Sequence, residues 1–144
     1  MAFKLGQVAV LKYKVGGISG GGAWITIGNV RDATLGLESG ETDVTTRSNN
    51  GWEASAPTLR KASIEFEMVW DESDAAFTAI KDAFMGVTPN LIGFQALSGD
   101  PGQGLQADCA IMTFSRGEAL TEAQKVSVTA KPTYSANAPS WITV

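Results

Sequence analysis

The side chains of this chain that could carry chemistry are carboxylates, hydroxyls and one cysteine, because the sequence contains no histidine. Glu65 and Glu67 stand two positions apart in an extended stretch, so they share one face. A glycosidase needs two carboxylates that face each other across a cleft, and this pair does not provide that. Without histidine, the serine and threonine hydroxyls have no imidazole to activate them as nucleophiles. The sequence therefore predicts a protein that is not an enzyme.

Oxygen-rich and glycine-rich segments could hold a cation or a phosphate group, but each has a simpler explanation. Residues 71–74 and residues 100–102 lack the twelve-residue spacing of an EF-hand, and helix capping and turn formation account for them. The glycine-rich residues 16–22 lack the Gly-Lys-Ser/Thr ending of a phosphate loop, and a strand is expected after them. Cys109, the single cysteine, stands in an apolar strand pattern and should be a buried thiol. We expect neither a cofactor nor a metal.

The composition indicates one mainly β domain with little charge. The chain has 144 residues, a length typical of a single domain, and 16 glycines that suit strands joined by turns. Charged residues make up 18% of the chain, which fits a surface that packs against neighbours. The net charge of −4 argues against binding nucleic acid through phosphates. No apolar run has the length of a membrane span or a signal-peptide core, so we expect synthesis in the cytoplasm and no membrane binding.

Hydrophobic periodicity predicts about seven short strands and one helix. The predicted strands cover residues 7–15, 23–37, 61–70, 91–97, 106–114 and 124–133, with a kink near residue 28 dividing the second. The helix is expected over about residues 72–85, with Asp71 or Ser73 as its N-cap and Gly86 at its C-terminal cap. These elements predict a small antiparallel β-sandwich or partly open barrel with one flanking α-helix.

Residues 38–50 form a strand-like segment that is too polar to bury one face, and residues 51–58 look irregular. Asn49-Asn50-Gly51 is a strong turn signal, and Trp52 follows it where no local core can receive an indole ring. Because such a segment cannot order itself by burial, we expect another copy of the chain to order it.

Charge is unevenly distributed along the first half of the chain. Residues 1–37 contain four basic residues and one acidic residue, whereas residues 38–74 contain nine acidic and three basic residues. This asymmetry would suit head-to-tail contacts between copies. Charge balance within one folded subunit explains it equally well, and the sequence leaves both explanations open.

The chain resembles the major tail proteins that form the tail tube of long-tailed, siphovirus-like bacteriophages. The resemblance lies in residues 27–35 (IGNVRDATL), residues 41–47 (ETDVTTR), Gly51-Trp52, residues 63–84 and residues 122–133 (EAQKVSVTAKPT), in that order. It implies a structural virion protein that self-assembles into stacked hexameric rings, forming a hollow tail tube through which DNA passes. It also implies one tail-tube domain over residues 1–144, with an N-terminal arm (1–6), a long extended inter-ring loop (36–59) and a C-terminal tail (134–144). The candidate inter-subunit residues in that loop are Glu41, Asp43, Val44, Thr45, Thr46, Arg47 and Trp52.

The partners implied by this resemblance are further copies of the chain, stacked head-to-tail, and other tail proteins at the tube ends. DNA would cross the lumen without specific binding. Glu65 and Glu67 are the lumen-facing candidates, because they lie opposite the apolar face of the best-defined strand and negative charge repels phosphate. Two alternatives remain open: a tube protein of a contractile tail or related injection machine, and a monomeric carbohydrate- or ligand-binding β-sandwich.

Overall fold

The computed structural model describes residues 3, 5–86 and 91–144, in which eight strands form one antiparallel sheet. The strand order is β2-β1-β5-β6-β7-β4-β3, and β8 pairs with β6 beside the end of β7. The elements are η1 (Gly6–Val8), β1 (Val10–Val15), β2 (Ile25–Thr26), β3 (Val30–Asp43), η2 (Arg47–Asn49), β4 (Ser55–Val69), α1 (Ala75–Phe84), β5 (Ile92–Leu97), β6 (Gln103–Gly117), β7 (Lys125–Pro132) and β8 (Ser140–Thr143).

The sheet bends round so that its two outermost strands approach at one corner. Strand β2 ends at Thr26 and β3 begins at Val30, so only residues 27–29 connect opposite ends of the strand order. Four Cα–Cα steps span at most about 15 Å, which forces this corner of the sheet to come together. The sheet does not close, and the predicted partly open barrel with one flanking helix is confirmed.

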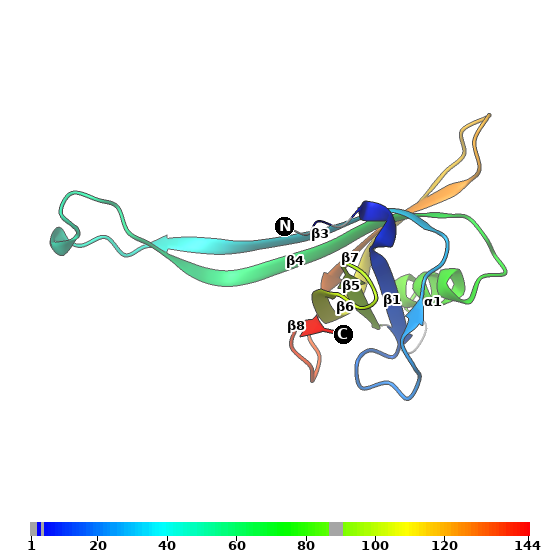
Figure 1. The fold of residues 1–144 in the computed structure, drawn as a ribbon, viewed down its shortest axis with the longest axis horizontal. Helices are drawn as coiled ribbons and strands as arrows, with labels where there is room; N and C mark the ends of the chain where they lie inside the picture. Colours follow the sequence, from blue (N-terminus) through cyan, green and yellow to red (C-terminus); the bar gives the residue numbers. More distant parts are fainter. Residues whose placement is uncertain (1–2, 4, 87–90) are drawn as a thin grey trace.

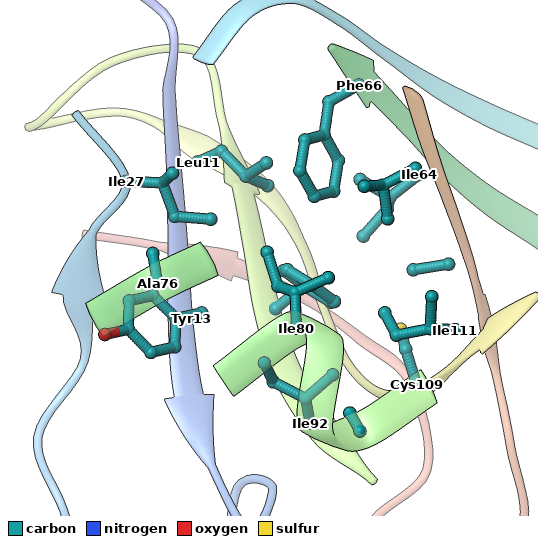
Figure 2. Close-up of a cluster of buried hydrophobic side chains, with 14 of the residues drawn as sticks. Leu11, Tyr13, Ile27, Ile64, Phe66, Ala76, Ile80, Ile92, Cys109 and Ile111 are labelled. Atoms are coloured by element: carbon teal, nitrogen blue, oxygen red, sulfur yellow. The ribbon is translucent and has the colours of Figure 1, made fainter. Parts of the chain in front are cut away.

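Helix α1 covers one face of the sheet, against β5 and β6 (Figure 1). Ile80 of α1 is fully buried among side chains that come from β1, β4, β5 and β6 (Figure 2). Trp70 packs edge-on against Phe77 of the helix, with 4.6 Å between ring centroids. The inward positions predicted from alternation are buried: Ile64, Phe66, Met68, Val126, Val128 and Ala130. Cys109 is also fully buried, as expected.

The helix begins later than the sequence predicted. Its N-cap is Asp74, whose side chain accepts a hydrogen bond from the Ala76 N–H at 3.2 Å. Neither Asp71 nor Ser73 is the cap, because Asp71 accepts hydrogen bonds from the Ser73 N–H (3.0 Å) and Oγ (2.6 Å) in a turn before the helix. These bonds lower the pKa of Asp71, the side-chain bond most. At the other end, Gly86 has a φ of 77° and follows Met85 as expected for a helix terminator.

The C-terminal segment is held to the body by a buried carboxylate. Asp108 is only 2% exposed, and it accepts hydrogen bonds from the Ile18 N–H (2.6 Å) and Ser135 Oγ (2.6 Å). It thereby joins the glycine-rich loop to the start of the tail. Farther along, β8 pairs with β6 from Gln106↔Ser140 to Gln103↔Thr143, a strand that the sequence did not predict. Of the expected N-terminal arm, residues 1, 2 and 4 lie outside the described residues.

Two searches of the described residues were negative. No helix there is long and apolar enough to span a membrane. Within the same residues, no group of three or more His, Cys, Asp or Glu side chains could hold a metal ion.

Candidate assembly surface

The most prominent feature outside the core is a two-stranded arm formed by the outer halves of β3 and β4 (Figure 1). The two strands pair from Val30↔Met68 to Asp43↔Ser55. Strand β7 flanks β4 only from Ile64 to Val69. Residues 36–63, which we call the arm, therefore extend beyond the rest of the sheet as a ribbon that ends in a tip, residues 44–54.

The pairing of β3 with β4 corrects one expectation about residues 36–59. They are extended, as predicted, but their order comes from hydrogen bonds within the ribbon rather than requiring a second copy of the chain. Residues 51–58, expected to be irregular, are strand from Ser55 onward. The sequence signal was weak because solvent lies on both faces of the ribbon, so alternation of apolar residues is not needed there.

Hydrogen bonds within the tip fix its shape. The Thr46 N–H donates to Asn49 Oδ1 at 2.6 Å and the Asn49 N–H donates to the Thr46 carbonyl at 3.1 Å, which together cap η2. Across the tip, the Ala54 N–H donates to Thr45 Oγ1 at 2.8 Å. Asp43 accepts from the Thr45 N–H at 2.9 Å, and bonds from Thr45 lower its pKa, the side-chain bond most. The candidates Asp43, Thr45 and Thr46 thus shape the tip.

The arm carries apolar side chains that no part of the subunit covers. Trp52 is 78% exposed and Leu59 is 80% exposed. Leu37 at the root of the arm and Val44 at the tip are also exposed. Exposed apolar side chains therefore occur along the arm from its root to its tip. Sequence reasoning identified Trp52 and Val44 but did not single out Leu37 and Leu59, although both lie within the loop expected over residues 36–59.

The remaining loop candidates are charged residues on or beside the tip. Glu41 pairs with Pro57 in the ribbon, next to a shift of register after Ser39. Arg47 opens η2 and is exposed. Neither makes an ion pair among the residues that the structure describes. Both charges are therefore available to a neighbouring molecule.

Glu65 and Glu67 lie on the outer face of the sheet, opposite the helix and core. Their cross-strand partners on β7 are Thr129 and Ser127. In the next strand, β6, the residues paired with Thr129 and Ser127 are Thr113 and Ser115. Glu67 is paired with Lys125 at 3.0 Å, whereas Glu65 is exposed. The face thus carries hydroxyl groups together with the two acids and the two lysines of β7, Lys125 and Lys131, and Glu67 is the acid with an ion-pair partner.

The other tryptophans are associated with the body. Trp70 packs on the core, as expected, and Trp24 is half-buried with Lys14 Nζ 5.8 Å from its ring centroid. Trp141 donates from Nε1 to Gln103 Oε1 at 3.0 Å and lines a hollow of about 590 Å³ beside the arm root. More than half of its surface stays exposed. Trp52 is therefore the one tryptophan without a contact to the body.

Ion pairs within the described part of the subunit do not explain the uneven distribution of charge along the chain. Lys12 pairs with Asp100 at 2.9 Å, and Glu67 pairs with Lys125, so each finds its partner in the second half of the chain. Among the described residues, no ion pair joins residues 1–37 to residues 38–74. Contact between copies remains open as the explanation.

Solved structures share this fold over nearly the whole chain. A chain in the tail of an empty gene transfer agent particle with C6 symmetry matches with a TM-score of 0.75 at 23% identity, covering 97% of this chain and 99% of that one. A chain of the SPP1 tail tube matches with a TM-score of 0.66 at 17% identity, over 89% and 74% of the two chains. The fold is that of a tail tube subunit.

The tail-tube fold includes the arm, because residues 36–63 make up far more of the chain than the 3% left outside the first match. A chain of the sheath–tube complex of an extracellular contractile injection system also matches, with a TM-score of 0.56 at 10% identity, over 93% and 88% of the two chains. No protein-family model and no curated protein matches the sequence.

Proposed function

We propose that this chain is the structural subunit of a phage-like tail tube, which assembles as stacked hexameric rings around a channel for DNA. The observation that carries the proposal is the arm: a ribbon with exposed apolar side chains, within a fold that matches a chain from a C6-symmetric tail over 97% of its length. The exposed apolar side chains of this arm would leave water only if another molecule covered them. We infer that the molecule whose surface covers the arm is another copy of the chain.

The arm tip is suited to docking on a copy in the next ring. Its internal hydrogen bonds fix the backbone before binding, so little conformational entropy is lost when Trp52 is buried. Exposed aromatic side chains on a rigid support are typical anchors of protein interfaces. Glu41 and Arg47 surround this anchor and would select the orientation of the partner through charge.

The outer face of the sheet is suited to lining a channel for DNA. Phosphate contacts from lysine and arginine would hold DNA by releasing counterions, which a conducting channel must avoid. Hydroxyl groups lie on this face between charged residues, and the two acids Glu65 and Glu67 offset the two lysines of β7, Lys125 and Lys131. DNA would therefore slide along the face without a specific site.

No enzymatic step belongs to this proposal, and the partners are copies of the same chain and other tail proteins at the tube ends. The function is exercised in the virion tail after assembly in the host cytoplasm. A second candidate is the tube of a contractile injection system, which the likeness to the sheath–tube complex favours. The two candidates differ in whether a sheath binds the outside of the tube.

The experiment compares the wild-type protein with an arm-tip deletion by negative-stain microscopy and size-exclusion chromatography at high concentration. Replacing residues 45–53 by Asn-Gly leaves the Val44–Ala54 main-chain hydrogen bond as the last link of a two-residue hairpin. We expect the wild type to form rings or tubes with a central hole, and the deletion to fold equally well but to stay unassembled. A wild type that stays monomeric, or a deletion that forms normal tubes, contradicts the proposal.

A further inference from the structure

The arm tip contains one asparagine whose side chain and following peptide nitrogen are both unengaged. Asn50 is exposed and has φ 54° and ψ 42°, the left-handed conformation. Gly51 follows with φ 82°, and no atom lies within 4 Å of the position that a Cβ would occupy there. Among the described residues, neither the Asn50 carboxamide nor the Gly51 N–H has a hydrogen-bond partner.

We propose that Asn50 is a site of spontaneous deamidation in the unassembled subunit. After the Gly51 N–H gives its proton to hydroxide, the nitrogen attacks Asn50 Cγ, and a new C–N bond closes a five-membered succinimide. The side-chain Nδ2 leaves as ammonia. One water then opens either ring C–N bond and leaves a carboxylate, as aspartate or as isoaspartate. One water enters and one ammonia leaves, with no oxidant or reductant.

The other described asparagines provide matched controls within the same molecule. Asn49 is the neighbouring residue in the tip, but its Oδ1 is held by the Thr46 N–H at 2.6 Å. Asn29 donates to the Val69 carbonyl at 2.8 Å, and Asn137 donates to Ser19 Oγ at 2.6 Å. Each of the three is followed by a residue with a side chain, which hinders approach of the peptide nitrogen. Hydrogen bonding and sequence therefore both single out Asn50.

The reaction requires Asn50 to leave the left-handed conformation, because Gly51 N must swing toward Cγ. In the free tip this motion requires opening of the turn that the Trp52 N–H to Asn49 carbonyl hydrogen bond closes at 3.1 Å, and glycine at position 51 adds no side chain that hinders it. A tip docked on a neighbouring copy would hold the backbone in place, so assembly should slow the reaction; this step rests on the proposed function. The product changes the net charge from −4 to −5 and places a carboxylate on a tip that already carries Glu53.

The test is peptide mass spectrometry after incubation of the purified subunit at neutral and mildly alkaline pH. We expect a mass gain of about 1 Da at Asn50, partly as isoaspartate, at a rate that rises with pH. Asn29, Asn49 and Asn137 should convert at least several-fold more slowly. The N50D variant, whose aspartate also tolerates the left-handed conformation and leaves Asn49 followed by a residue with a side chain, should show no mass gain in the tip. An intact Asn50, or equal conversion at the three control sites, overturns the proposal.

A second incubation separates this proposal from the proposed function. Assembled tubes and free subunits are held at the same pH and sampled together. Several-fold protection of Asn50 in the tubes supports docking of the tip. Equal conversion in both samples contradicts docking of the tip, while deamidation itself stands on the free-subunit result.

Discussion

Removal of the exposed indole of Trp52 should separate the energetics of assembly from those of folding. In the W52A variant the subunit loses a side chain that touches little of its own fold, since Trp52 is 78% exposed. If a neighbouring copy covers this indole in the tube, W52A removes the burial from the assembled state only. The subunit itself should remain folded.

The expected magnitudes follow from the exposed area. An aromatic side chain of this kind covers about 200 Å², so the 78% exposed part of Trp52 amounts to about 160 Å². At about 25 cal/mol per Å², full coverage by a neighbour contributes about 4 kcal/mol per contact. This corresponds to about a thousandfold change in contact affinity. The area already buried in the subunit is about 40 Å², which limits the loss of folding free energy to about 1 kcal/mol.

Two assays measure these quantities side by side. Sedimentation or light scattering gives the critical concentration for tube growth, and urea unfolding gives the free energy of unfolding of the subunit. The control is W52F, which retains part of the apolar area and should give a critical concentration between those of the wild type and W52A. The reasoning is refuted if W52A lowers both stabilities by similar amounts, or if the critical concentration does not change.

Three further predictions concern the body and the tip. Burial, with a smaller effect of Asp108, raises the pKa of Cys109 to about 12, above its usual 9.0. The folded thiol therefore resists alkylation. The free energy of unfolding falls as the pH rises from about 9 toward about 12, because the unfolded thiol ionises first. In urea unfolding at a series of pH values, C109A should lack this contribution to the pH dependence. The D108A variant removes the shared acceptor of two partly buried donors, the Ile18 N–H and the Ser135 hydroxyl, and should lose about 3 kcal/mol in urea unfolding, with D108N between it and the wild type. The lowered pKa of Asp43 keeps its bonds to Thr45 intact at and above the ordinary value of 3.8, so the protection factor of the Thr45 amide, its exchange rate relative to an unstructured peptide at the same pH, should fall only when the pH drops below that value. Loss of protection already at neutral pH would contradict this.

The sequence predicted best where one face of a strand is buried and the other is not. Residues 61–70 and 124–133 alternate because the core enforces it, and both were assigned to the correct face. The helix was located, but its start was placed early because residues 71–74 contain several side chains that can cap. Capping propensity alone cannot choose among them.

Long-range contacts account for what the sequence did not reveal. The arm was recognised as extended and polar, yet its register with β4 depends on pairing between residues far apart in the chain. Strand β8 has four residues, too few for alternation to be read. The sequence places Asp108 in a strand beside Cys109 and does not indicate its role. That role is to accept hydrogen bonds from the Ile18 N–H and the Ser135 hydroxyl, which are far from it in the chain.

The most direct test of the account is a cryo-EM reconstruction of the assembled protein. The account predicts stacked six-fold rings, with the tip around Trp52 buried on a copy in the adjacent ring and the face that carries Glu65 and Glu67 turned toward the central channel. A reconstruction in which the arm projects free into solvent, or in which α1 rather than this face lines the channel, would contradict it.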